Sequence, residues 1–313
     1  MQNIHYKQLD LTRKDKEQLY LQKLQNQEFF IIGIEIFDPD ISQYCHLNFD
    51  PQHSGDNYKS TALETIFNIK TELKNISKNF NNILLITIKS DLDSISSMSL
   101  VTMVLRDTFE LNGDLILRLK ALSLSDKHGI DQDWNPNIKH YDFNIPEYTK
   151  YGLPVSLIVL IGDINLNINY KVKTMIDFLF TGNFKDDEKY KKINASKQLN
   201  VRNNTSYQII IPDKLIYVES TFRGAIGYGY KKAPVVIAKN KRYSFGKKSN
   251  RVLGVKYTIA QFKEKYIDLV KIQDEINNLE KGWGGSAVII GSPQTNPSIL
   301  TEKQLIDLVS KYV

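Results

Sequence analysis

The 313-residue chain lacks several features that would assign it to a class at once. It has one cysteine, Cys45, so an intrachain disulfide and a zinc site built from several cysteines are excluded. No apolar run approaches the ~20 residues that a membrane span needs. The first residues, Met1 to Gln8, contain no apolar segment of the kind found in secretory signals. A reducing, cytoplasmic location is therefore expected, with no membrane partner.

Common nucleotide-binding and hydrolase motifs are also absent. The sequence has no Walker A motif, no Rossmann glycine fingerprint and no nucleophile elbow. Negative charge is missing from residues 220–263, which hold eleven basic side chains and no Asp or Glu. The net charge is +6, so the rest of the chain carries about −5. Such a segment favours a polyanionic partner, and a solvated lysine-rich surface is the alternative.

The pattern of apolar runs predicts the fold class. Phe29–Phe37 and Ile83–Ile88 are predicted buried strands, while residues 60–75 and 94–108 are predicted helices. The expected fold is α/β, with an N-terminal mostly parallel sheet domain and a second, smaller C-terminal α+β domain. The expected boundaries are an N-terminal helical extension at 1–27, an α/β candidate metal-binding domain at 28–181, a linker at 182–205 and an α+β substrate-binding domain at 206–313.

Two further local predictions can be compared with the structure. His46–Phe49 follows the first strand closely and is interpreted as its hairpin partner. Residues 259–280 are interpreted as one long amphipathic helix that ends at Gly282.

Acidic residues and histidines follow the predicted strands. Asp91 and Asp93 come directly after Ile83–Ile88, where an open α/β sheet binds its ligands. Asp50 with His53, and Asp126 with His128, form two similar clusters. Carboxylates and imidazoles suit a divalent ion such as Mg, Mn or Zn. The alternative is that these residues only cap helices and form turns.

A glycine-rich stretch, Gly282–Ser286, precedes another predicted strand. Glycines let a backbone approach a ligand closely, and successive N–H groups can bind an anion. We therefore expect Gly284, Gly285 and Ser286 to contact a phosphate, with Arg223 as a bidentate partner. A helix C-cap followed by turns is the alternative.

These motifs together resemble the DHH-type phosphoesterases. Ser90 to Ser97 is similar to that family's Asp-x-Asp turn, and Gly282–Ser286 to its C-terminal glycine motif. Asp50–His53 and Asp126–His128 each resemble a degenerate Asp-His-His, although an intact Asp-His-His does not occur. The resemblance implies an α/β N-terminal domain that holds two metal ions, often manganese. It also implies a smaller C-terminal domain with a glycine-rich substrate loop.

The expected function is metal-dependent hydrolysis of a phosphoester or phosphoanhydride in a nucleotide or short nucleic acid. A two-metal site with Mn or Mg is expected, and a homodimer is compatible with the sequence. The expected metal ligands are Asp50, His53, Asp91, Asp93 and Asp126. The expected catalytic residues are His53 and His128, which would position water or protonate the leaving group.

Two other functions stay open. One is a non-catalytic nucleotide-binding or single-stranded nucleic-acid-binding protein, because aromatic residues that can stack on bases lie among the basic ones. They are Phe222, Tyr228, Tyr230, Tyr243, Phe245 and Tyr257. The other is a structural or partner-binding protein in which the acidic clusters are only caps and turns.

Overall fold

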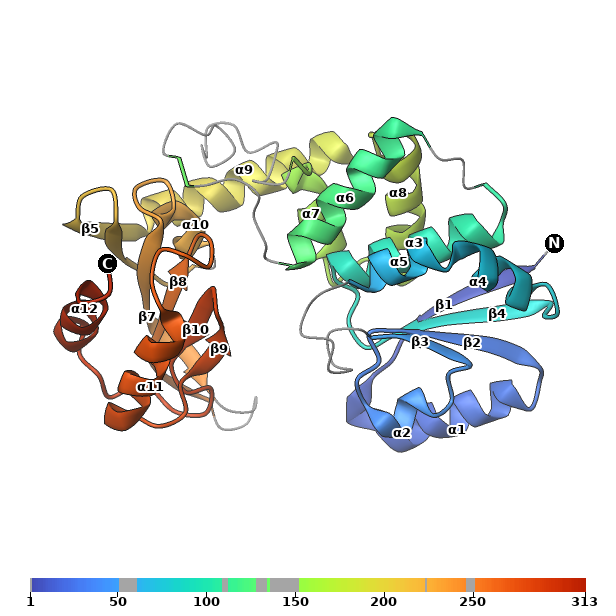
Figure 1. Cartoon of the computed structure of the whole chain (residues 1–313), viewed down its shortest axis with the longest axis horizontal. Helices are drawn as coiled ribbons and strands as arrows, with labels where there is room; N and C mark the ends of the chain where they lie inside the picture. Colours follow the sequence, from blue (N-terminus) through green and yellow to red (C-terminus); the bar gives the residue numbers. More distant parts are fainter. Residues whose placement is uncertain are drawn as a thin grey trace. The chain divides into compact units, whose positions relative to one another are not determined.

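The structure, a computed structural model, describes residues 2–50, 61–108, 112–127, 134–135, 152–222, 224–245 and 251–313. These residues form two compact units (Figure 1). Unit 1 consists of the described residues of 1–127 and 151–190, and unit 2 of those of 128–150 and 191–313. Both units contain helices and strands, so the predicted α/β class is confirmed.

Unit 1 is built on a four-stranded parallel sheet with the order β1-β4-β2-β3. The strands are β1 (Asn3–Gln8), β2 (Phe29–Ile34), β3 (Leu47–Phe49) and β4 (Asn82–Thr87). The central strands β2 and β4 are buried over almost their whole length. Continuous apolar runs are typical of parallel strands that are covered on both faces.

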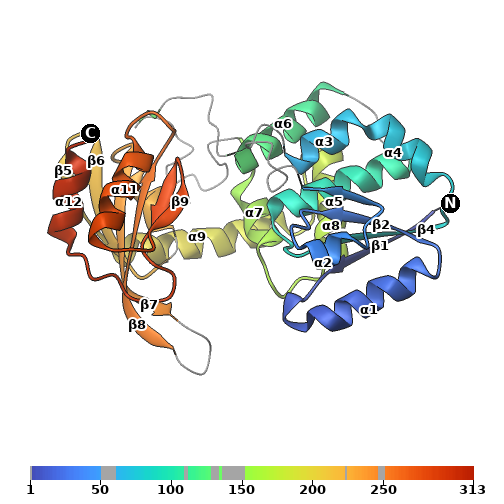
Figure 2. The same ribbon diagram turned by 60° about the horizontal axis from the view of Figure 1, so that its bottom comes forward.

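Helices cover both faces of this sheet (Figures 1 and 2). On one face, α1 (Lys14–Gln25) and the short α2 (Pro39–Ser42) pack on a core that includes Leu21, Ile31 and Leu84. The other face carries α3 (Ala62–Asn68), α4 (Lys70–Ser77), α5 (Leu92–Leu105), α6 (Gly113–Lys127) and α8 (Ile168–Thr181). Unit 1 also contains the 3₁₀ helix η1 (Leu11–Arg13), α7 (Val155–Ile161) and the start of α9 (Asp187–Asn203). Helix α5 is the central one, because every residue from Ser94 to Val104 is buried.

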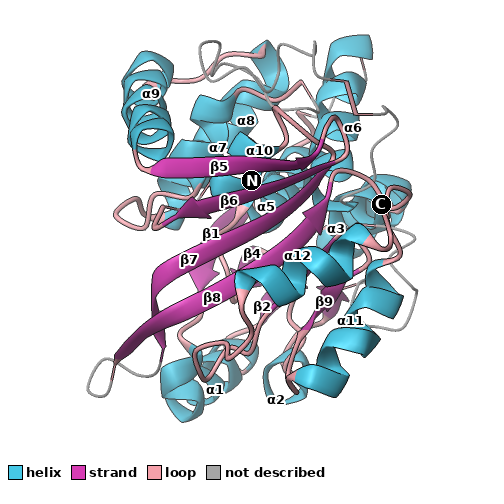
Figure 3. Cartoon of the chain, turned by 90° about the vertical axis from the view of Figure 1, so that its left-hand side faces the viewer, coloured by secondary structure: helices cyan, strands magenta, loops and turns pink. Residues whose placement is uncertain are grey.

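Unit 2 is built on a six-stranded mixed sheet with the order β5-β6-β7-β8-β10-β9. Figure 3 shows β5, β6, β7 and β8 side by side. The strands are β5 (Thr205–Ile211), β6 (Leu215–Ser220), β7 (Val235–Phe245), β8 (Val252–Gln261), β9 (Gly284–Ser286) and β10 (Ile289–Gly291). The helices α11 (Leu269–Leu279) and α12 (Glu302–Ser310) contribute to the larger core, and α10 (Ala225–Gly229) to a smaller one.

The far halves of β7 and β8 extend beyond the rest of the sheet as a two-stranded ribbon (Figure 2). Strand β6 pairs with β7 only over residues 235–239, and β10 pairs with β8 only over residues 258–260. Among the described strands, residues 240–245 and 252–256 therefore pair only with each other. The ribbon carries several of the basic residues that distinguish segment 220–263.

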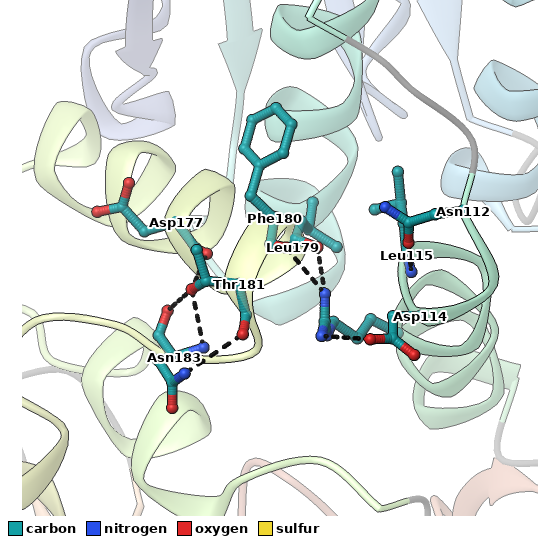
Figure 4. A network of polar contacts seen from close by, with 9 residues as sticks. Asn112, Asp114, Leu115, Asp177, Leu179, Phe180, Thr181 and Asn183 are labelled. Carbon is teal, nitrogen blue, oxygen red and sulfur yellow. Dashed lines mark hydrogen bonds and ion pairs between the residues drawn. The ribbon is translucent and has the colours of Figure 1, made fainter.

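The end of α8 illustrates how two helices are joined in unit 1. Gly182 follows the helix with a left-handed φ of 75°. The Arg118 guanidinium of α6 donates to the carbonyl oxygens of Leu179 at 2.8 Å and Phe180 at 3.2 Å (Figure 4). It also lies 3.6 Å from an Asp114 carboxylate oxygen. A cation at a helix C-terminus is favourable because the last carbonyl groups carry partial negative charge.

Three local predictions are wrong. Residues 3–8 belong to the predicted helical extension but form β1, which pairs with β4; as an edge strand, β1 does not need an apolar sequence. His46–Phe49 is not a hairpin partner, because β3 runs parallel to β2. Residues 259–280 are not one helix: β8 continues to Gln261, and α11 begins after Asp268, whose side chain caps it.

The expected linker at 182–205 is largely the helix α9, and the boundary between the two units falls within it. Within the described residues, no helix is both long enough and apolar enough to cross a membrane.

Candidate functional site

A cavity of about 360 Å³ lies at the carboxyl edge of the unit 1 sheet. It is formed by the residues that follow β2 and β4, the first turn of α5 and the end of α6. The cavity therefore occupies the edge at which open α/β sheets bind ligands. Its lining consists of Glu35, Phe37, Thr87, Ile88, Lys89, Asp91, Leu92, Asp93, Ser94, Leu122 and Ser125.

Asp91 and Asp93 reach this cavity from one turn. Asp91 is the N-cap of α5, and its carboxylate accepts a hydrogen bond from the Ser94 backbone N–H at 3.3 Å. Asp93 lies in the first turn of the same helix and is half-buried. Both carboxylates are stabilised by the positive end of the helix dipole. The i, i+2 spacing therefore brings two carboxylates to one cavity.

Glu35 adds a third carboxylate from a different strand. It follows β2 directly and adopts a left-handed φ of 55°, which costs a non-glycine residue roughly 1–3 kcal/mol. Its carboxylate accepts a hydrogen bond from the Ser94 hydroxyl at 2.8 Å. The sequence offers one signal for it: Glu35 is the only charged residue in the apolar run from Phe29 to Phe37. Ser94 thus connects the end of β2 to the Asp91 turn.

A buried lysine also contacts the turn that precedes α5. Lys171 of α8 is only 2% exposed, and its ammonium donates to the Ser90 hydroxyl at 3.0 Å and the Ser90 carbonyl at 3.4 Å. Burial lowers the pKa of Lys171, and the charges of Asp163 and Asp91 oppose this shift. A buried ammonium needs such partners because loss of hydration is costly.

The other predicted ligands are not brought together in the described residues. Asp50 follows β3 at the same edge of the sheet but does not line the cavity. Asp126 belongs to the last turn of α6 rather than to a loop, and its side chain lies outside the described part. His53, His128 and Arg223 also lie outside the described residues.

The described side chains do not by themselves form a complete metal site. Among them, no group of three or more His, Cys, Asp and Glu side chains is arranged to hold a metal ion. Asp91, Asp93 and Glu35 share the cavity without meeting that condition. The oxygen donors of the cavity are nevertheless of the type that Mg and Mn prefer.

The predicted phosphate loop forms the outer hairpin of unit 2. Gly284, Gly285 and Ser286 make up β9, which pairs with β10. Gly285 has a φ of 156°, and a Cβ there would lie 2.0 Å from the Ile289 carbonyl oxygen. The hairpin alone therefore accounts for this glycine. The three residues are exposed, and their contact with a phosphate stays a prediction.

No protein-family model matches the chain, and a search of curated proteins finds no matching sequence. The cavity and the residues around it are therefore the basis on which a function can be inferred.

Proposed function

We propose that unit 1 hydrolyses a phosphoester or phosphoanhydride in the 360 Å³ cavity, with the help of Mn or Mg. The observation that carries the proposal is the convergence of Glu35, Asp91 and Asp93 with Lys89 in one cavity at the carboxyl edge of a parallel sheet. Carboxylates are ligands for hard divalent ions, and a lysine ammonium suits a phosphate. The resemblance of Ser90–Ser97 to the Asp-x-Asp turn of DHH-type phosphoesterases points to the same chemistry.

The carboxylate oxygens in the cavity are of the chemical type that binds a divalent ion. Asp91 and Asp93 would hold it from one turn, and the remaining ligands would have to come from the expected set of Asp50, His53 and Asp126. A bound divalent ion activates water and neutralises phosphoryl oxygens. Two ions are proposed, as the resemblance implies. A cytoplasmic location is part of the same proposal.

Other residues of unit 1 would bind the phosphate group and hold the two aspartates in position. Lys89 is exposed at the cavity and would attract the phosphate group. Glu35 holds the Ser94 hydroxyl, and Lys171 holds Ser90, so the turn that carries both aspartates is fixed from two sides. Such fixation matters because catalytic groups must be held in place before substrate binds.

The replacement Asp91→Asn tests this proposal. Asparagine is as good an N-cap as aspartate, so α5 should keep its cap, and loss of the charge at the helix N-terminus should cost only about 0.3–1 kcal/mol of stability. Loss of the charge should reduce the rate of Mn-dependent hydrolysis by more than ~100-fold. Replacing a residue that only hydrogen-bonds to a metal ligand typically reduces activity by about 10–100-fold. The measurement is the rate of release of phosphate or nitrophenol from small phosphoester and phosphoanhydride substrates by the full chain.

Asp268→Asn is the matched control. Asp268 also caps a helix, accepting from the Lys271 backbone N–H at 3.1 Å, but it lies in unit 2 and outside the cavity. This variant should retain full activity. Equal activity of the Asp91→Asn variant and the unchanged protein would reject the proposed site.

A further inference from the structure

A second cavity, of about 190 Å³, lies within unit 2. It is bounded by the end of β6, the start of α10, and the adjoining parts of β7 and β8. Two aromatic rings, Phe222 and Tyr243, and two lysines, Lys239 and Lys256, belong to its lining together with Ile226 and Asn240. The combination of rings, lysines and aliphatic surface matches a planar ligand with negative charge.

The structure separates most of the aromatic residues of segment 220–263 into two groups. Phe245 and Tyr257 are each 2% exposed and belong to the interior. Tyr230 packs edge-on against Phe262, with 5.5 Å between ring centroids. Phe222, in contrast, is 40% exposed, and Tyr243 is half-buried at the cavity. Phe222 and Tyr243 are thus the rings of this set that line the cavity.

Tyr243 is held in place before any ligand arrives. Its ring meets that of buried Phe245 edge-on at 4.9 Å, and the Lys256 ammonium lies 4.8 Å from its centroid. A side chain fixed in this way loses little conformational freedom on binding.

The two lysines of the cavity differ in their charge partners. Lys239 lies 3.2 Å from a Glu219 oxygen and 3.1 Å from a Glu302 oxygen, so its charge is compensated. Lys256 donates to the Gln294 side chain at 2.9 Å and the Ser292 carbonyl at 3.3 Å, both neutral groups. Within the described residues it makes no ion pair with a carboxylate, and burial lowers its pKa. Lys256 is therefore the better placed of the two to receive an anion.

We propose that this cavity binds one nucleotide unit, with the base against the rings of Phe222 and Tyr243 and the phosphate at Lys256. Aromatic rings beside cations are the common means of holding single-stranded bases without reading their sequence. The basic ribbon of β7 and β8 adjoins the cavity and provides further positive charge. This binding does not depend on the hydrolysis proposed for unit 1.

The test is equilibrium binding by the full chain without added metal, so that hydrolysis does not interfere. The probes are adenosine monophosphate, a five-nucleotide single strand of deoxythymidine, ribose 5-phosphate and a hexaglutamate peptide. A free nucleotide and a single strand both offer a base and a phosphate to this cavity. Comparing the first two probes shows which of them the protein prefers. Both base-containing ligands, or one of them, should bind at least about tenfold more tightly than ribose 5-phosphate, because stacking contributes that much per base.

Three substitutions test whether the ligand binds in this cavity. Phe222→Leu and Tyr243→Leu should each weaken binding of the base-containing probe roughly tenfold. Lys256→Gln should weaken it and reduce the salt slope on a single strand by about 0.7. Tyr207→Leu is the control, because Tyr207 is 46% exposed on β5 of the same unit and does not line the cavity. It should bind like the unchanged protein.

Several outcomes would overturn the inference. If neither base-containing probe binds more tightly than ribose 5-phosphate, or if hexaglutamate binds as tightly as the tighter of these two probes, binding would be assigned to charge alone. An equal effect of Tyr207→Leu and Tyr243→Leu would place the ligand elsewhere, and absence of binding to every probe would reject a nucleotide site. If Tyr243→Leu fails to fold, the exposed Phe222 still provides the test. Hydrolysis of a small non-nucleotide substrate, measured separately on these variants, keeps the two proposals distinguishable.

Discussion

Glu28 and Glu35 flank β2, and both have left-handed backbone conformations, with φ of 60° and 55°. Glu28 is exposed, whereas Glu35 accepts a hydrogen bond from the hydroxyl of fully buried Ser94. The two residues therefore carry the same backbone cost but differ in what their side chains do. This difference can be measured directly.

Replacing each glutamate with glycine separates the two contributions. Both substitutions remove the same left-handed strain, but only Glu35→Gly leaves the Ser94 hydroxyl without its acceptor. Because an unsatisfied buried donor costs about 1–3 kcal/mol, Glu35→Gly should be less stable than Glu28→Gly by that amount. Urea unfolding of both variants measures the difference. Equal free energies of unfolding would mean that the Glu35–Ser94 hydrogen bond contributes nothing.

The end of helix α8 leads to a prediction about stability. Gly182→Ala should lower the free energy of unfolding by more than about 1 kcal/mol, because its φ of 75° disfavours a side chain. The added Cβ would also lie 2.9 Å from the Arg118 guanidinium, which holds the last carbonyl groups of α8. Thermal or urea unfolding measures the loss.

Gly113→Ala is the control for that substitution. Gly113 begins α6, and a Cβ there would meet no heavy atom within 4 Å. This variant should be as stable as the unchanged protein or slightly more stable, because alanine restricts the unfolded chain. An equal loss of stability in both variants would show that neither the left-handed φ of Gly182 nor its contact with Arg118 explains the effect of Gly182→Ala.

The elements that could be predicted from the sequence are those with strong local signals. The runs in β2 and β4 are long and apolar, and Asp91 directly precedes an apolar helix, so the sheet edge and its acidic turn follow from neighbouring residues. The edge strand β1 has a polar sequence and depends on its pairing with β4. The break between β8 and α11 involves the buried Gln261 side chain, which accepts from the backbone N–H groups of Lys265, Tyr266 and Ile267, as well as the Asp268 cap.

The candidate site was only partly predictable for a related reason. The Ser94 hydroxyl meets Glu35 across 59 residues of sequence, and Lys171 meets Ser90 across 81. No spacing rule connects residues so far apart, because their contact depends on how α5 and α8 pack on the sheet. Asp91 and Asp93 come from one turn, which is why their shared cavity could be predicted.

The whole molecule has two units, each with a hydrophobic core of its own, and this leads to a prediction about their unfolding. Ile237 is fully buried in the larger core of unit 2, so Ile237→Ala should cost about 2–5 kcal/mol. Amide hydrogen exchange should become faster in β6, β7 and β8 while β4 of unit 1 keeps its protection.

Ile209→Ala is the control, because Ile209 is 51% exposed on β5 of the same unit. It should change exchange very little. Equal acceleration in β4 and β7 of the Ile237→Ala variant would show that the two units unfold as one.

The burial of α5 also limits how this protein can acquire a new substrate. Ser94 to Val104 are packed on all sides, with Ser99 donating to the Val172 carbonyl at 3.2 Å, so almost any change along that helix disturbs the interior. Leu122 and Ser125 also line the unit 1 cavity but belong to a different helix, α6. Directed evolution of substrate range should therefore accumulate substitutions on α6 and in the Ile88–Lys89 segment, while α5 stays nearly invariant.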